Sequence, residues 1–336
     1  MLNLVPDHRL DYRVIAAEGP DAAAFLQAQL CNDLKALSSG SDAQEAATLT
    51  QAQLSGYCNA KGRLYASFLI WLERPDLFHL LLPSALAPSL VKRLSMFVLR
   101  AKVKIRETDR AVWGAEFDEP LELSPFAHQG FTLVSANLPV QANTAGRQRL
   151  WLIGPEGSKE ASEAVLSSNQ APPNFKTLAP AVWQAHEVQQ GLPWFQAELS
   201  ERFVPQTVNL DLLGGVSFTK GCYPGQEVVA RSHYLGKLNQ RMFLFQGPCG
   251  LFPGEDVFLA SANPENMEPI GEVVSVSSAL DTTRAFYLVS LKLEPFRGQS
   301  SVTGRIAASQ EQVLLELQTL PYAVPREPQV PNRPKL

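Results

Sequence analysis

The sequence contains few cysteines, and none of them forms a metal-binding motif with another. The four, which are Cys31, Cys58, Cys222 and Cys249, are spread over 336 residues without a C-x-x-C pair. Such spacing predicts neither a zinc site nor a ferredoxin-type cluster. We therefore expect reduced thiols and no permanent metal.

An excess of charge of one sign and a long apolar run are also missing. The formal net charge is only −4, so contact with nucleic acid or an anionic membrane would require a local basic patch. No stretch approaches the ~20 apolar residues that span a bilayer, and residues 1–11 resemble neither a secretory signal nor an Arg-rich leader. We expect a cytoplasmic protein without a membrane partner.

The composition that remains is typical of a folded protein. Apolar residues make up 45% of the chain and charged residues 18%. This balance describes an ordinary globular protein, and the length allows two or three domains.

Local patterns predict the elements of the first two thirds of the chain. Asp21 is placed to cap a helix over residues 22–34, and Ser84 to cap a second helix that ends near Phe97. The strands at 47–51 and 63–71 are expected to form a hairpin around the turn 59–62. Other strands are predicted at 12–16, 130–134 and 149–153, with helices at 181–191 and, on the surface, within 154–173.

A perfectly alternating run lies at Leu99–Arg106, where odd positions are apolar and even positions are cationic. Period-two alternation predicts one strand with its four cations on the same face. That face is either the solvated side of a sheet or a site for an anionic partner such as RNA phosphates or a polyglutamate tail. The four cations are Arg100, Lys102, Lys104 and Arg106.

The composition changes after Gly236. Short β-branched and aromatic runs, punctuated by glycine and proline, predict a small β-barrel or sandwich. The last residues, from Pro325, hold four prolines and predict an extended tail. The runs are 241–246, 256–260, 270–277, 283–293 and 312–318.

One stretch, Thr219–Arg231, combines turn chemistry with a thiol. Gly221 and the Pro224–Gly225 pair favour turns, and the apolar run from Val228 can continue as a helix. Cys222 would then lie beside the positive end of a helix dipole, with Lys220 two residues away, and both favour the thiolate. The alternative is that Cys222 is a small core residue.

The run Lys220–Glu227, which reads Lys-Gly-Cys-Tyr-Pro-Gly-Gln-Glu, resembles the signature of the YgfZ family of folate-binding proteins. That family is a branch of the aminomethyltransferase (GcvT-like) superfamily and is related to mitochondrial iron–sulfur assembly factors. The similarity extends from about residue 10 to about residue 324. It includes the segments 19–33, 59–63, 203–210, 214–218 and 231–237.

The resemblance implies an α+β fold. Residues 1–238 are expected to form a GcvT-like folate-binding body of antiparallel sheets and helices in two subdomains around a ligand cleft. Residues 239–324 would form the C-terminal β-barrel and residues 325–336 the Pro-rich tail. The loop that carries Cys222 would face the cleft.

The resemblance also implies roles for particular residues. Cys222, with Lys220 and Glu227 nearby, would be the reactive centre. An aromatic on the first strand and a later tryptophan bind folate in the family, and the matching positions are Tyr12 and Trp183; packing of either ring in the core is the alternative. The rest of the signature loop is Gly221, Tyr223, Gly225, Gln226 and Arg231.

The implied function is that of a protein that binds tetrahydrofolate or a folate derivative and supports the assembly or repair of iron–sulfur enzymes. Its partners would be those enzymes or their assembly proteins, with indirect or weak contact to tRNA. In the family this affects tRNA modification, and a link to control of replication initiation is also known. We expect a supporting protein, not an enzyme.

The alternative is an enzyme of one-carbon transfer, namely a folate-dependent aminomethyltransferase or demethylase. In true aminomethyltransferases, the strand after the Lys-Gly turn carries a pair of aspartates that assist transfer. The matching residues are Ala66 and Ser67, and Gln189 stands where the family often has a glutamate. Neither Ala66 nor Ser67 can relay a proton as a carboxylate does, which disfavours this alternative.

Overall fold

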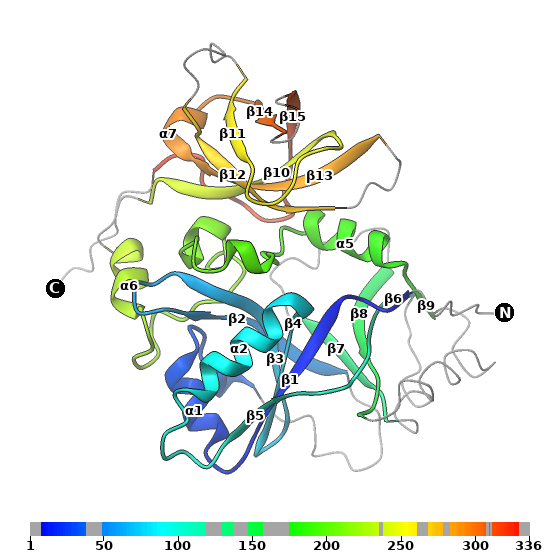
Figure 1. Cartoon of the computed structure of the whole chain (residues 1–336), viewed down its shortest axis with the longest axis vertical. Coiled ribbons are helices and arrows are strands. Elements are labelled where there is room, and N and C mark those ends of the chain that lie inside the picture. The colour runs from blue at the N-terminus through cyan, green and yellow to red at the C-terminus, as the bar shows by residue number, and fades with distance from the viewer. Residues whose placement is uncertain are drawn as a thin grey trace. The chain divides into compact units, whose positions relative to one another are not determined.

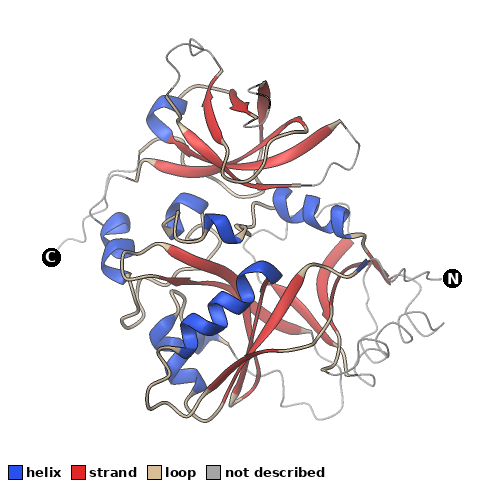
Figure 2. Cartoon of the chain, viewed as in Figure 1, coloured by secondary structure: helices blue, strands red, loops and turns tan. Residues whose placement is uncertain are grey.

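The computed structural model describes residues 8–37, 49–118, 130–136, 147–156, 175–234, 238–260, 268–277, 283–306, 309 and 311–328. The chain divides into two compact units. The first comprises Met1–Ser55 and Phe68–Trp183, and the second comprises Gly56–Ser67 and Gln184–Leu336. Strands dominate both units (Figure 2).

The first unit is built on a nine-stranded sheet with the order β5-β1-β4-β3-β2-β7-β8-β6-β9 (Figure 1). β7 runs parallel to β2, whereas β1, β4 and β5 pair in antiparallel fashion, as do β6, β8 and β9. The strands are β1 (Tyr12–Glu18), β2 (Thr50–Cys58), β3 (Leu64–Arg74), β4 (Leu77–Pro83), β5 (Lys104–Glu107), β6 (Val112–Asp118), β7 (Thr132–Ala136), β8 (Arg147–Ile153) and β9 (Phe175–Thr177).

This sheet curls until the start of β1 approaches β6. Arg9 forms an isolated bridge with Trp113, and the Leu10 N–H donates to the Val112 carbonyl at 2.8 Å. The half of the sheet around β6 has its own core, which includes Trp113, Phe131 and Leu150. The curl therefore brings the strand that carries Tyr12 beside the strand against which Trp183 packs.

The two early helices form, but neither of the predicted caps does. α1 (Ala22–Gln29) ends before Leu34, and α2 (Ala87–Ser95) follows the 3-10 turn η3 (Ser84–Leu86). The Asp21 carboxylate accepts the backbone N–H of Lys102, and the Ser84 hydroxyl donates to Asp11. Each of these side chains therefore bonds to a residue distant in sequence and does not accept an N–H group from the first turn of its helix.

α1 is shorter than predicted because side chains after it bond to the backbone. Asn32 Oδ1 accepts the Asp33 N–H, and the Asp33 carboxylate accepts the Lys35 N–H at 3.0 Å. Such local bonds compete with the helical ones. The chain therefore leaves the helix at Leu30, where ψ is 153°, and forms a separate turn, η2 (Leu34–Ala36).

The prediction of one cationic strand over Leu99–Arg106 was wrong. Only β5, from Lys104 onward, is a strand. Leu99 is 86% exposed although the alternation assigned it to the core face. Residues 99–103 form no strand, and Lys102 among them bonds to Asp21 through its backbone, so the four cations do not share one sheet face.

The predicted strands at 130–134 and 149–153 and the helix at 181–191 were confirmed as β7, β8 and α5 (Pro180–Gln189). The hairpin is confirmed in β2 and β3, whose connecting turn closes with the Asn59 N–H donating to the Arg63 carbonyl at 2.8 Å. The start of its first strand, at 47–48, and the predicted surface helix, from residue 157 to its end, lie outside the described residues.

The second unit contains the predicted barrel. Its order is β10-β13-β12-β11-β14-β15, every neighbouring pair is antiparallel, and the sheet closes. Phe243, Phe245 and Tyr287 are among the residues that fill it. The strands are β10 (Gln240–Pro248), β11 (Asp256–Leu259), β12 (Gly271–Val276), β13 (Arg284–Lys292), β14 (Ser301–Arg305) and β15 (Gln312–Gln318); α7 (Leu293–Phe296) follows β13.

The sequence patterns missed β14. This strand is short and includes Gly304, whose Cβ, if present, would lie 2.2 Å from Leu251. A glycine inside a strand weakens the sequence signal, and here a close approach of a side chain requires it. The other elements of the second unit are η4 (Ala197–Leu199), η5 (Pro205–Val208) and α6 (Gln226–Tyr234). None of the helices in the described ranges could cross a membrane.

Candidate functional site

The signature loop ends in a helix, as predicted. α6 begins at Gln226, whose N–H donates to the Tyr223 carbonyl at 3.1 Å. Gly225 has φ = +77°, and its carbonyl accepts the N–H groups of Val228 and Val229. The positive φ needs glycine. Cys222 therefore lies in a tight turn directly before a helix start.

This turn packs on the turn between β2 and β3. A Cβ on Gly225 would lie 2.3 Å from the Asn59 carbonyl oxygen and 2.6 Å from Gly62, and a Cβ on Gly62 would lie 2.8 Å from Val228. The Asn59 side chain in turn accepts the N–H groups of Lys61 and Arg63. The signature loop and the segment 59–63, which resemble the family separately in sequence, thus pack together as one structural unit (Figure 1, where α6 lies beside the hairpin end).

Cys222 is exposed, whereas Cys31 and Cys58 are buried. Cys249, in the barrel, is the other exposed thiol among the described residues. The alternative that Cys222 is a core residue is therefore excluded. Its position leaves the sulfur open to a ligand or partner.

Lys220 supports the loop from inside. It is 8% exposed, and its ammonium lies 5.4 Å from the centroid of the Tyr223 ring, which is itself buried. The Lys220 N–H donates to Ser217, and its carbonyl accepts from the Gln226 side chain at 3.4 Å. The cation–π contact and these bonds fix the backbone on both sides of Cys222.

Glu227 and Arg231 lie on α6 and are exposed. They are four residues apart, so they project from the same side of the helix. Glu227 is in the first turn, where a negative charge suits the helix dipole. Val228 and Tyr234 also expose 39% and 36% of their surface. The exposed surface beside Cys222 is thus both charged and apolar.

An aromatic group closes the far end of α6, and sequence reasoning missed it. The rings of Phe218 and His233 are stacked with centroids 3.7 Å apart and an angle of 15°. Tyr234 meets both rings edge-on. Because Phe218 precedes the signature loop and His233 follows it, the stack ties the two ends of the loop together.

The residues before the signature serve to anchor it to the barrel. Gln206 donates to the Val229 carbonyl at 2.7 Å, and Arg241 of β10 donates to the Gln206 carbonyl. Arg241 also forms a bidentate pair with Asp211 at 2.6 and 3.0 Å, and both side chains are buried. The Asn209 side chain bonds to both backbone groups of Met242. Residues 206–211 therefore connect α6 to β10 and stabilise the second unit.

A cavity of about 370 Å³ opens between the hairpin turn, α6 and the barrel strands of the second unit. Its volume is that of a small-ligand site. Two cations, Arg63 and Lys292, contribute to its wall, so an anionic group would suit it. The other lining residues are Val204, Thr207, Ser232, Leu238, Asn239 and Gln240.

Trp183 lies in the first unit, on α5, and its side chain is 3% exposed. Its ring packs so closely on Gly114 that a Cβ there would lie 2.1 Å from it, and it meets Trp151 edge-on at 5.2 Å. Within the described part of the chain, the indole N–H has no hydrogen-bond partner. This nitrogen is itself buried, so a ligand could reach the N–H only by entering the core of the first unit. Tyr12 is half-buried at the start of β1.

The positions that carry the transferase carboxylates have structural roles. Ala66 and Ser67 are buried, and the Ser67 hydroxyl donates to the Pro193 carbonyl. Gln189 is half-buried near the end of α5. Sequence reasoning missed a neighbouring buried carboxylate, Glu187, which accepts the indole N–H of Trp194 at 3.0 Å.

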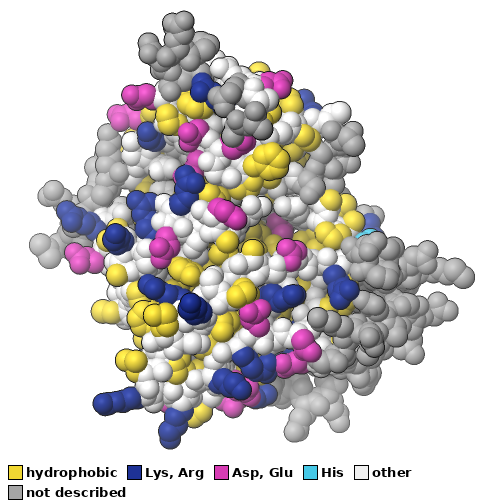
Figure 3. All heavy atoms as spheres, viewed as in Figure 1, with side chains coloured by type: hydrophobic (Ala, Val, Ile, Leu, Met, Phe, Trp, Pro, Cys, Tyr) yellow, Lys and Arg dark blue, Asp and Glu magenta, His cyan; other side chains and the backbone are white. Residues whose placement is uncertain are grey.

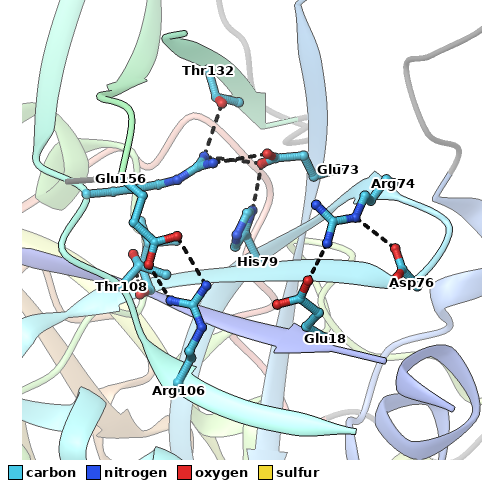
Figure 4. A network of polar contacts seen from close by, with 11 residues as sticks. Glu18, Glu73, Arg74, Asp76, His79, Arg106, Thr108, Thr132 and Glu156 are labelled. Carbon is cyan, nitrogen blue, oxygen red and sulfur yellow. Dashed lines mark hydrogen bonds and ion pairs between the residues drawn. The ribbon is translucent and has the colours of Figure 1, made fainter. Parts of the chain in front are cut away.

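A polar network in the first unit was also missed, since its members are far apart in sequence (Figure 4). Glu73 lies at a bulge in β3, 2.7 Å from His79 Nδ1 and 3.0 Å from Arg110, which also donates to Thr132. Burial raises the pKa of Glu73, but the bond and charge of His79, with those of Arg110, lower it overall to about 2. The network joins β3, β4 and β7.

Arg106, in the same view, donates to Glu156 through both terminal nitrogens. Its charge is therefore compensated, whereas the other three cations predicted to share its face form no ion pair with a described residue. Among the described residues, no three His, Cys, Asp or Glu side chains gather as a metal site would require.

The chain resembles curated proteins over nearly its whole length. It is 30% identical over 328 residues to a tRNA-modifying protein YgfZ of Edwardsiella ictaluri (strain 93-146), covering 94% of this chain and 92% of that protein. Identity to the protein of the same name from Vibrio atlanticus (strain LGP32) is 26%, covering 96% and 94%. No family model matches the chain.

Among solved structures, the chain resembles the glycine cleavage system aminomethyltransferase T from Bartonella henselae. The TM-score is 0.63 at 14% sequence identity, with 96% of this chain and 87% of that chain covered. At this identity the similarity concerns the fold. The GcvT-like α+β fold expected from the sequence is thereby confirmed.

Proposed function

The chain belongs to the family of the tRNA-modifying protein YgfZ, and from this premise we propose that it binds tetrahydrofolate or a derivative and supports iron–sulfur enzymes that modify tRNA. It would aid the assembly or repair of those enzymes in the cytoplasm. The named relatives support the link to tRNA modification, and the GcvT-like fold supports the folate ligand.

The observation that carries this proposal is the exposure of Cys222 in a rigid loop. Lys220, Tyr223 and Gln226 fix the loop from inside, while Gly225 rests on the hairpin turn. A protein that needed Cys222 only for packing would bury it. An exposed thiol on a fixed loop suits contact or exchange with a client protein or its cluster, and Glu227 and Arg231 would orient that client.

Trp183 would contribute to the folate site through its indole N–H. The pterin ring of folate carries acceptor atoms that such a donor can bind. Tyr12 would add an aromatic surface from the start of β1, which the curl of the sheet brings beside β6. Each assignment is tested by binding below.

The alternative, a folate-dependent aminomethyltransferase or demethylase, requires a group that relays a proton. Ala66 has none, and the Ser67 hydroxyl already donates to the Pro193 carbonyl. One assay distinguishes the transferase from the supporting protein. Turnover of a methylamine donor in the presence of tetrahydrofolate would favour the transferase, and its absence across several donors would remove that alternative.

Complementation tests the role of Cys222. In cells that lack their own family member, the wild-type chain should restore methylthio-modified tRNA, whereas Cys222→Ser should not. Cys249→Ser is the matched control because Cys249 is also exposed but lies in the barrel domain, directly after β10. Full restoration by Cys222→Ser would refute the proposed role of the thiol.

Calorimetric titration tests the folate site. Micromolar affinity for tetrahydrofolate corresponds to about −8 kcal/mol, within reach of a small-molecule site. Trp183→Phe keeps an aromatic ring and removes the N–H, and it should weaken binding at least tenfold. Trp151→Phe removes a neighbouring N–H that likewise has no partner among the described residues, and it should change nothing. Equal losses in both variants would mean that packing alone was disturbed.

A further inference from the structure

The segment after α2 exposes apolar side chains at an unusual density. Seven large apolar residues are exposed in the described part of the chain, and three of them lie within four positions. These are Met96, Phe97 and Leu99, with exposed fractions of 61%, 42% and 86%. Single exposed apolar residues are ordinary, but a cluster marks an interaction surface.

This segment and the last turn of α2 are together strongly basic. Residues 92–104, which we call the basic turn, contain five cations and no acidic residue. None of the five forms an ion pair with a described residue, in contrast to Arg106. The five are Lys92, Arg93, Arg100, Lys102 and Lys104. Figure 3 shows Lys and Arg side chains protruding at the lower left, where the turn after α2 lies.

The basic turn is held in place by contacts with the start of α1. The Asp21 carboxylate accepts the Lys102 N–H at 2.6 Å. Gly19 lies so close that a Cβ on it would be 2.1 Å from the Lys102 carbonyl oxygen. Lys104 then enters β5, which pairs with β1. Among the described residues, Asp21 is the carboxylate that bonds to the turn, and it accepts a backbone N–H and pairs with none of the cationic side chains.

We propose that the basic turn binds tRNA. Its cations would contact phosphates, and Phe97 would stack on an unpaired base, with Arg93 beside it at 5.6 Å from the ring centroid. The inference rests on the proposed function, which makes tRNA the expected polyanion. A membrane is disfavoured because the apolar face of α2, with Leu90 and Leu94, is buried and cannot enter a bilayer.

The test is fluorescence anisotropy of an unmodified tRNA transcript titrated with the full chain at several salt concentrations. The triple variant Arg100→Gln, Lys102→Gln, Lys104→Gln should bind at least tenfold more weakly, and the slope of log affinity against log salt should fall by about 2–3. Phe97→Ala should weaken binding severalfold and leave that slope unchanged. These side chains are exposed, so the thermal unfolding midpoint should not move.

The matched control removes three cations elsewhere: Lys176→Gln, Arg284→Gln and Arg297→Gln, all exposed and each already beside a carboxylate. It should bind as wild type does. An equal loss in this control, or no loss in the triple variant, would overturn the proposal. Binding to vesicles of anionic lipid without binding to tRNA would replace tRNA with a membrane.

The experiments distinguish a failure of tRNA binding by the basic turn from a failure of the proposed function. A wild-type chain that restores tRNA modification in cells but does not bind tRNA would refute the basic turn alone. A chain that fails to complement and does not bind folate would refute the proposed function, whatever its affinity for tRNA.

Discussion

Gly225 and Gly62 lie backbone against backbone. A Cβ on Gly225 would be 2.6 Å from the Cα and the N of Gly62, well inside van der Waals contact. The contact joins the loop that exposes Cys222 to the turn between β2 and β3. The position of the thiol therefore depends on two glycines that are distant in sequence.

Replacing Gly225 by alanine should destabilise the protein and abolish complementation. The positive φ and the clash with Gly62 together predict a loss of about 2–4 kcal/mol in the free energy of unfolding, measured by denaturant titration. Gly221→Ala is the control within the same loop, since its φ is not positive and a Cβ there meets nothing within 4 Å. Equal free energies of unfolding for the two variants would show that the contact between Gly225 and Gly62 does not stabilise the protein.

The four thiols should fall into two classes. With an aromatic disulfide reagent, Cys222 and Cys249 should react in the native protein, because both are exposed. Cys31 and Cys58 should react only after unfolding. Cys222→Ser should remove one of the two native-state equivalents. More than two equivalents in the folded protein would contradict the burial of the other pair.

The network around Glu73 should make stability depend on acid pH. Because its pKa is lowered to about 2 on folding, ionised Glu73 stabilises the fold. Its contribution is fully present above about pH 4.5 and is lost as the pH falls towards 2. Glu73→Gln should therefore lower the free energy of unfolding by about 2–3 kcal/mol at pH 7, and the difference from wild type should shrink below pH 4.5.

The measurement is urea unfolding at a series of pH values. Glu227→Gln is the control, since Glu227 is exposed on α6. A constant difference between Glu73→Gln and wild type from pH 7 to pH 2.5 would show that the charge of Glu73 is not what stabilises the network.

Replacing only one partner of the buried ion pair between Arg241 and Asp211 should strongly lower the free energy of unfolding. Arg241→Ala would leave an unpaired carboxylate and is expected to cost about 3–5 kcal/mol of unfolding free energy. Changing both residues to apolar ones, as in Arg241→Met with Asp211→Leu, should cost less. The exposed pair of Arg297 and Glu327 provides the comparison, and its loss should have little effect. A double variant that is less stable than both single variants would contradict the prediction that an unpaired buried charge causes the loss.

The sequence was sufficient for the elements that obey one local rule. All the barrel strands except β14 alternate or run apolar, and the turn chemistry of Gly221, Pro224 and Gly225 placed Cys222 before a helix, as the structure confirms. The cap predictions at Asp21 and Ser84 failed because a side-chain oxygen bonds whichever donor or acceptor the fold brings to it. The cationic strand failed for the same reason, since the contact of Asp21 with Lys102 outweighs alternation.

Local sequence is enough to identify the turn formers, the cations and the run that carries the thiol, because these are properties of the residues and their neighbours. The contacts of Gly225 with Gly62, of Trp183 with Gly114 and of Glu73 with Arg110 arise only in the folded chain. These relations join residues far apart in the chain, and they arise from strand order and backbone contact, which no local pattern encodes.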